Sequence, residues 1–454
     1  MGAQRNSRSK KENETLRASE LFYLVFDQLE FYAAMYLLFI AIYLVLYWKV
    51  FWGILDPMFY SIINLVGGAF CVWLLNYQGS LKPLYLNSFI TTEIGLIVGF
   101  LLSMYLPVLK LSPSKSPFDD VSDAQIVSEF DVFAFLISCT YIVVEFISIA
   151  TVGIIIFSQE ENHASAFGDH GILRTFVASY RIIMTSVLFY KRIVLKRSWT
   201  VFEIVSLLVL LFGVLTSGSK SSILTFVFLY FIISYPLINA GKIQKIKVSL
   251  PFLIILMSFP IAVIMIKVGA NPATAAQQVY LRLLASGDIF LLGYNDEIMA
   301  GLSESSFFKY AFYPGWGSIL KNLGFAITPP RLIGSDIFEY YTNALEGGGP
   351  NARHNYLALH FFGLNGAPFY SLAIGLFIGF IRNTFRQINP YQVSYFSYLV
   401  AVIFAYQAPS LIDDINVFTN FIFWSLLFLV VSYVATKLIY VILLGWAYKQ
   451  ASNS

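Results

Sequence analysis

Long apolar runs with few charges recur along this chain of 454 residues, and they restrict its fold more than any other feature. A membrane-spanning helix needs about 20 apolar residues, because its backbone polar groups must bond within the helix where water is absent. About eleven runs have this length; they cover residues 31–48, 56–76, 85–107, 131–157, 173–190, 201–217, 221–239, 249–266, 364–381, 391–409 and 418–436. Only 12% of the residues are charged, against about 25% in soluble domains. The sequence therefore predicts an all-α polytopic membrane protein.

The predicted spans are distributed unevenly along the chain. A basic N-terminal tail (1–30) precedes a bundle of about eight helices (31–267); a large loop (268–363), the last spans (364–446) and a short tail (447–454) follow. The loop carries amphipathic stretches and aromatic turns, and a long loop with structure of its own is usually functional. A cap that only covers the bundle is the alternative.

Cations in short loops indicate how the chain is oriented. They gather at 191–197, 242–247 and 382–386, which the positive-inside rule places in the cytoplasm. The loop 268–363 then lies outside. The basic N-terminal tail also favours the cytoplasm. With four predicted spans before residue 158, the chain would then return to the cytoplasm there, whereas the three basic loops put this part of the chain outside. We follow the frame that three loops support.

Charges inside spans need partners, because each costs about 2.5–3.5 kcal/mol at the bilayer centre. Arg174 and Arg181 lie on one face of a predicted helix, and Glu93 or Glu145 of neighbouring spans could pair with them. Arg174 lies beside an outer loop, so it could instead bind an anionic head group.

Three further cations are candidates for binding phosphate. Lys220 lies in a turn of small polar residues (216–222), where backbone N–H groups, hydroxyls and a cation suit phosphate oxygens. The turn lacks P-loop spacing, and an ordinary turn with a snorkelling lysine is the alternative. Arg282 and Arg331 lie in the long loop and could bind a diphosphate bidentately or be surface cations.

A polar cluster ends the long loop and opens onto an apolar run. It comprises Arg353, His354, Asn355 and Tyr356. A histidine can accept a proton near neutral pH, and the adjacent arginine offers fixed positive charge. A histidine anchored at the membrane interface is the alternative. The glycines that follow would give the helix small faces for close packing, at Gly363, Gly366, Gly375 and Gly379.

These features resemble the bacterial O-antigen polymerases and, more distantly, the O-antigen ligases of the GT-C group of membrane glycosyltransferases. The turn at Gly218-Ser219-Lys220 resembles the family's short Gly/Arg/Lys turn. A large outer loop before the last spans is shared. The run Arg353-His354-Asn355-Tyr356-Leu357, with Gly363 and Gly366 after it, resembles the family's His-Asn-x-x-Leu…Gly-x-x-Gly pattern. The resemblance covers residues 130–430.

The resemblance implies a polymerase of undecaprenyl-diphosphate-linked oligosaccharide repeat units, active on the periplasmic side of the bacterial inner membrane. An acceptor hydroxyl would attack the anomeric carbon of the growing chain and release undecaprenyl diphosphate, with no nucleotide sugar, cofactor or metal. Expected partners are the lipid-linked oligosaccharide, the bilayer, a chain-length regulator and a flippase, and no nucleic acid.

The resemblance also assigns roles to the candidate residues. His354 would be the catalytic base, with Arg353 beside it, and Asn355 and Tyr356 would position the acceptor. The diphosphate would be held by Arg353 together with Arg174, Lys220, Arg282 and Arg331.

Rival classes make different demands on the sequence. A transporter or flippase of lipid-linked oligosaccharide would show pseudo-symmetric halves and broken midplane helices, which the uneven layout does not suggest. A membrane acyltransferase would place its histidine within reach of a cytoplasmic thioester, whereas the charge pattern puts His354 outside. A structural subunit would leave the shared face of Arg174 and Arg181 unexplained. The sugar, its linkage and the kind of surface polysaccharide stay open.

Overall fold

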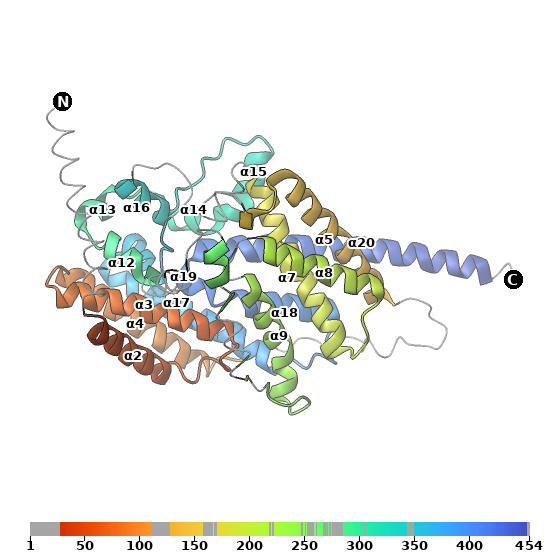
Figure 1. Ribbon diagram of the computed structural model, residues 1–454, viewed down its shortest axis with the longest axis horizontal. Coiled ribbons are helices and arrows are strands. Elements are labelled where there is room, and N and C mark those ends of the chain that lie inside the picture. Colours follow the sequence, from red (N-terminus) through yellow and green to blue (C-terminus); the bar gives the residue numbers. More distant parts are fainter. Residues whose placement is uncertain are drawn as a thin grey trace. The chain divides into compact units, whose positions relative to one another are not determined.

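In the computed structural model, all regular secondary structure in the described residues is helical (Figure 1). These are residues 28–109, 128–157, 167, 170–217, 219, 222–246, 248–249, 251, 258–259, 261–266, 271, 274, 285–303, 305–342 and 349–451. Within them, nine helical segments are long and apolar enough to cross a membrane. They contain α2 (Leu29–Leu46), α3 (Pro57–Tyr77), α4 (Pro83–Ser103), α5 (Glu129–Val152), α7 (Gly171–Phe189), α9 (Ser222–Asn239), α17 (His354–Gln387), α18 (Tyr395–Gln407) and α20 (Ile415–Ala451). These helices support the predicted polytopic membrane protein.

The remaining helices are shorter. They are η1 (Ile155–Phe157), η2 (Tyr190–Val194), α8 (Val201–Thr216), η3 (Ala285–Gly287), α12 (Asp288–Gly293), α13 (Asp296–Gly301), α14 (Phe307–Phe312), η4 (Tyr313–Gly317), α15 (Ser318–Asn322), α16 (Ile333–Thr342) and α19 (Ser410–Asp413). The predicted span 201–217 corresponds to α8, which is apolar but shorter than the other candidates. The predicted span 249–266 is described only in part. The N-terminal tail falls largely outside the described residues, whereas residues 447–451 of the predicted C-terminal tail continue the helix α20.

Local sequence explains where several helices begin. At α3, Asp56 accepts a hydrogen bond from the Met58 N–H, and a proline occupies the first helical position, where its missing N–H costs nothing. At α8, Thr200 and Glu203 form a reciprocal capping box. These caps satisfy backbone donors that a helix leaves unpaired at its start.

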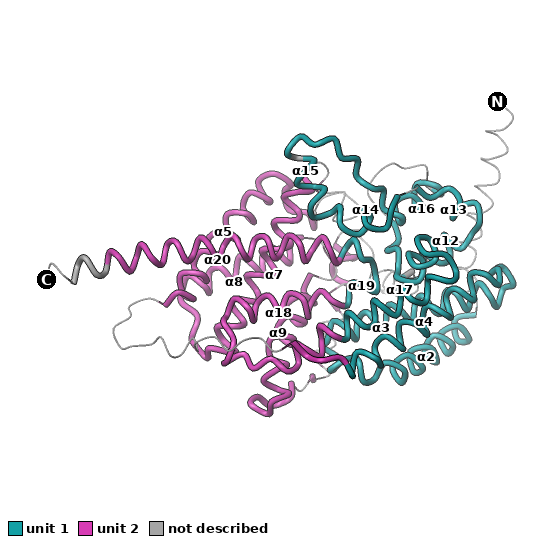
Figure 2. Tube along the Cα trace, turned by 180° about the vertical axis from the view of Figure 1, so that it is seen from behind, with its two compact units in different colours: residues 1–105, 271–379, 409–417 teal, residues 106–270, 380–408, 418–454 magenta. Residues whose placement is uncertain are grey.

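The chain divides into two compact units (Figure 2). Unit 1 comprises residues 1–105, 271–379 and 409–417, and unit 2 comprises 106–270, 380–408 and 418–454. In unit 1, α3 packs against α2 and α4, and the short elements η3 and α12 also pack on α3. Part of the predicted outer loop therefore lies along an apolar helix.

Unit 2 is built around α7, which packs against α5, α8, α9 and α18. Its polar contacts tie the helix ends together. Glu129, at the start of α5, accepts from Tyr395 at 2.7 Å and from Lys437 of α20 at 2.6 Å. The C-terminal part of α20 continues past the other helices of this unit (Figure 2).

The helix α17 begins at His354, before the predicted start of that span at residue 364. It consists of two helical segments joined at Gly363, whose φ is 63° and ψ is −177°. This backbone conformation is essentially restricted to glycine. Gly363 therefore supplies a sharp bend, whereas the sequence predicted only a small packing face there.

Candidate functional site

His354 is the first residue of α17, and its side chain is completely buried in unit 1 (0% exposed). Its Nδ1 lies 3.0 Å from the Oγ of Ser371, which belongs to the second segment of the same helix. In a continuous α-helix their 17-residue separation would place them about 25 Å apart. The bend at Gly363 brings the two side chains together.

Glu93 of α4 approaches the opposite nitrogen of His354, with Oε1 3.5 Å from Nε2. The carboxylate is well supplied with donors. Asn355 Nδ2 donates to Oε1 at 3.0 Å, and the hydroxyls of Tyr43 and Tyr47 donate to Oε2 at 3.1 and 3.4 Å. All five side chains are buried. A histidine and a carboxylate thus face each other in the interior of unit 1, inside a shell of hydrogen-bond donors.

Glycines allow the close approach of α4 and α17 that forms this cluster. A Cβ at Gly99 would lie 2.3 Å from the backbone oxygen of Leu372, and one at Gly375 would meet the α4 backbone equally closely. This agrees with the predicted packing role of Gly375. The approach also places Thr92 of α4 beside Asn355, whose Nδ2 donates to the threonine hydroxyl at 2.9 Å.

Arg353 precedes the helix with a positive φ of 50°, which is uncommon outside glycine. Its backbone N–H donates to the carbonyl of Asp413 at 2.7 Å, and its Nη1 pairs with the Asp413 carboxylate. Its Nε and Nη2 donate to the carbonyl of Ser286 at 3.1 and 2.7 Å. Burial lowers the pKa of this guanidinium. A diphosphate would therefore have to compete with Asp413 for Arg353.

Two carboxyl groups near Arg353 have pKa values shifted towards neutrality. Burial raises the pKa of Asp414 to about 6, although Tyr310 and the Asn416 N–H donate hydrogen bonds to it. Burial also raises the pKa of Asp288 to about 6, and the nearby Arg353 opposes that shift. The protonation of this region therefore changes in the physiological range.

Tyr356 belongs to a stack of three tyrosines. Its ring lies 5.8 Å from the ring of Tyr294, and that ring lies 4.9 Å from the ring of Tyr85. The Tyr356 hydroxyl donates to the carbonyl of Gly293 at 3.1 Å, and Tyr85 donates to Asp296 at 2.7 Å. These contacts tie the start of α17 to α4 and to the segment around α12 and α13.

The cations predicted to bind diphosphate have different environments. Arg174 is exposed in the first turn of α7, in unit 2, and no ion pair joins it to another described residue. Arg331 is 52% exposed in unit 1 and pairs with Asp336 at 2.9 Å and with Glu339. Lys220 and Arg282 lie outside the described residues.

The sequence left two partners open for Arg181, and the structure selects one of them. Arg181 Nη2 lies 3.3 Å from Glu145 Oε2 within unit 2, so the pairing with Glu145 is confirmed. Tyr141 donates to the same carboxylate at 2.9 Å. The other candidate partner, Glu93, belongs to the cluster around His354 in unit 1.

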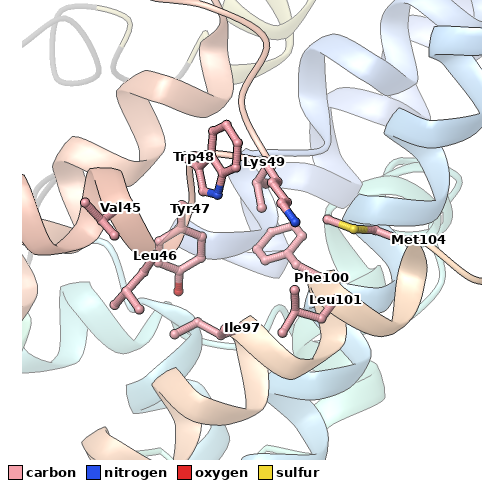
Figure 3. Close-up of a pocket in the computed structure, with 10 residues that line it drawn as sticks. Val45, Leu46, Tyr47, Trp48, Lys49, Ile97, Phe100, Leu101 and Met104 are labelled. Atoms are coloured by element: carbon pink, nitrogen blue, oxygen red, sulfur yellow. The ribbon is translucent and has the colours of Figure 1, made fainter.

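A cavity of about 250 Å³ lies between the C-terminal ends of α2 and α4 (Figure 3). Its walls are mainly apolar, and they include Tyr47, Lys49 and Phe100. Tyr47 also donates to Glu93, so one side chain contacts both the cavity and the buried cluster. Lys49 Nζ lies 5.6 Å from the centroid of the Trp48 ring, another residue of the cavity wall.

Sequence reasoning singled out His354 as a candidate but did not predict the two side chains that its ring faces. Glu93 did carry a signal, since it is a charge inside an apolar run, but its position suggested an arginine partner. Ser371 carried none, because an isolated serine in a spanning helix is common. Across the described part of the chain, no group of three or more His, Cys, Asp or Glu residues is arranged to hold a metal ion.

No protein-family model, no curated protein and no solved structure matches the chain.

Proposed function

We propose that this protein polymerises undecaprenyl-diphosphate-linked oligosaccharide repeat units in the bacterial inner membrane, with its active site on the periplasmic side. The observation that carries the proposal is the buried pair of His354 and Glu93 in a polytopic membrane protein. Arg353 directly precedes the histidine in the chain. A histidine oriented by a carboxylate can take a proton from a hydroxyl group and be stabilised as imidazolium. The resemblance of the surrounding sequence to O-antigen polymerases supplies the substrate class.

The chemistry requires one proton acceptor and one stabilised leaving group. The acceptor hydroxyl attacks the anomeric carbon of the growing chain, and its proton passes to His354. The bond from that carbon to the diphosphate oxygen breaks, and its electron pair leaves with undecaprenyl diphosphate. Cationic side chains that hold the diphosphate lower the barrier by neutralising the charge that develops on it. Arg174, Lys220, Arg282, Arg331 and Arg353 are the proposed group.

The burial of His354 sets a condition on this reaction. Because the side chain is 0% exposed, the contact between the start of α17 and its neighbours must open when the acceptor binds. Enzymes whose intermediates must be kept from water commonly open to bind the substrate and close again for the reaction. In the proposed topology of about eleven spans, the acceptor enters from the outer loop, residues 268–363.

Reconstitution tests the proposal. Wild type, His354→Ala and His360→Ala would receive a lipid-linked repeat unit in EDTA without nucleotide sugar, with products resolved on a gel. His360 is the matched control, because it lies on the same helix and is only half-buried. We expect a ladder from wild type and His360→Ala. In His354→Ala the rate should fall about 10²–10⁴-fold at unchanged protein levels.

A flippase of the same lipids is the second candidate. Ionisable residues buried among apolar helices, as Glu93 and His354 are here, also serve as proton relays in transporters. Movement of labelled lipid between leaflets, without a ladder across a panel of repeat units, would overturn the polymerase and favour the flippase.

A further inference from the structure

We propose that Ser371 delivers the reaction's proton to Nδ1 of His354, while Glu93 holds the hydrogen on Nε2. The inference rests on the proposed polymerase function for the identity of the hydroxyl that loses the proton. It names Ser371 as a proton relay on one side of the histidine and Glu93 as a positioning residue on the other, and it predicts which ring nitrogen is the base.

The carboxylate of Glu93 determines the proton on Nε2. It accepts hydrogen bonds from Asn355, Tyr43 and Tyr47, at 3.0, 3.1 and 3.4 Å. These three donors all direct hydrogens at the carboxylate, whose oxygens act as acceptors toward them. His354 Nε2, 3.5 Å from Oε1, must therefore carry a hydrogen to interact favourably with it. An unprotonated Nε2 would place two acceptors face to face in a buried site.

The other nitrogen then has a free lone pair. With Nε2 protonated, neutral imidazole accepts through Nδ1, which lies 3.0 Å from Ser371 Oγ. The serine side chain is 0% exposed, so water does not compete with Nδ1 for its hydroxyl. In this tautomer Nε2 turns its hydrogen toward the Glu93 carboxylate, which at 3.5 Å is within ion-pair distance, and Nδ1 faces a donor at hydrogen-bond distance.

The same arrangement gives a balanced proton transfer. As the acceptor oxygen bonds to the anomeric carbon, its proton moves to Ser371 Oγ, and the original Ser371 proton moves to His354 Nδ1. The serine ends as a hydroxyl and the histidine as imidazolium. Glu93 stabilises the positive charge, and the electron pair of the broken glycosidic bond leaves with the diphosphate.

The tautomer can be measured without any enzymatic assay. Protein labelled with ¹⁵N in histidine would be studied by NMR, and loss of one signal in His354→Asn would identify His354. We expect hydrogen on Nε2 and an unprotonated Nδ1 at neutral pH. Hydrogen on Nδ1 with a bare Nε2 would overturn the inference, whatever the protein's activity.

Kinetics test the relay itself. Ser371→Ala should lower kcat about 100-fold or more at similar KM, and Ser371→Thr, which keeps a hydroxyl, should recover much of the loss. Ser186→Ala is the matched control, since Ser186 is equally buried but donates to the Ile182 carbonyl of its own helix. Glu93→Gln should lower kcat and shift the rate profile to lower pH, because the imidazolium loses its counter-charge.

The outcomes separate the two proposals. An active wild type whose rate is unchanged by Ser371→Ala would overturn the relay and leave the polymerase standing. A folded wild type without polymerising activity would overturn both, while the NMR result would still decide how Glu93 orients the histidine.

Discussion

Glu93 of α4 and His354 of α17 face each other in the interior of unit 1, with Oε1 and Nε2 3.5 Å apart. The two residues belong to helices that are far apart in the sequence, so local structure does not bring them together. The contact depends on glycines that let two helices touch and on one glycine that bends α17. Each of these dependences can be tested.

The bend at Gly363 should be essential to the site. A Cβ at this position would meet no atom within 4 Å, so Gly363→Ala changes backbone preference without a steric clash. The strain of an alanine at φ 63° and ψ −177° is about 1–3 kcal/mol. We expect a lower melting temperature in detergent and loss of the His354 to Ser371 contact, seen as a changed ¹⁵N signal of His354.

Gly445→Ala is the control for that variant. This glycine also has open space around its Cβ position, but it lies within α20 and shows no positive φ. Alanine should be neutral or stabilising there by about 0.5–1 kcal/mol. Equal melting temperatures for the two variants would contradict the role given to Gly363.

Arg353 should stabilise the start of α17 more than any exposed arginine could. Arg353→Ala removes the buried member of an ion pair with the part-buried Asp413, together with its hydrogen bonds to Ser286, and should cost about 1.5–3 kcal/mol. Arg353→Lys should recover little, because one ammonium cannot bond Asp413 and the Ser286 carbonyl as the guanidinium fork does. Thermal unfolding in detergent measures the effect.

Arg331→Ala is the comparison for Arg353. Arg331 is 52% exposed although it also pairs with two carboxylates, so its removal should cost at most about 1 kcal/mol. If Arg331→Ala destabilised the protein as much as Arg353→Ala, burial would not explain the importance of Arg353.

Asp414 should make stability depend on pH. Burial raises its pKa from 3.8 to about 6, so between these values the folded state binds more protons than the unfolded state. Stability therefore falls as pH rises through this window, and the loss is complete above about pH 6. Asp414→Asn removes a penalty of about 3 kcal/mol. Its melting temperature should exceed that of wild type at pH 8 and approach it at pH 5.

Asp413→Asn is the matched control, because it changes the neighbouring carboxylate that pairs with Arg353. It should lower the melting temperature at both pH values. A constant difference between Asp414→Asn and wild type across the range would show that Asp414 does not titrate near pH 6.

Arg174 should contribute to ligand binding rather than to stability. It is exposed at the start of α7 without an ion pair to any described side chain, so Arg174→Ala should leave the melting temperature unchanged. A hydrogen bond to a charged group is worth about 1.5–3 kcal/mol, so the Kd for a short-chain polyprenyl diphosphate should rise about tenfold or more. Calorimetry on reconstituted protein measures it.

Arg192→Ala provides the comparison, since Arg192 is exposed in η2 at the other end of the same helix. Its removal should not change the Kd. Equal losses of affinity in the two variants would indicate a non-specific charge effect and remove Arg174 from the proposed site.

The amino-acid sequence determined the class of this protein, because the need to bond backbone groups without water requires long apolar helices wherever they cross a bilayer. Most helices follow the predicted runs within a few residues, and the cluster from Arg353 to Tyr356 stood out by its charge and position. Because a charge inside a span needs a partner, the sequence also limited the partner of Arg181 to Glu93 or Glu145.

Tertiary structure alone decided which of these groups meet. Glu93 faces His354 because α4 and α17 approach through glycines, and Ser371 reaches the same histidine because Gly363 bends the chain. Asp413 neutralises Arg353 through a contact between distant segments. Helical periodicity predicts which face of one helix a residue occupies, but the partner on the next helix depends on packing, and packing depends on the whole set of neighbouring side chains.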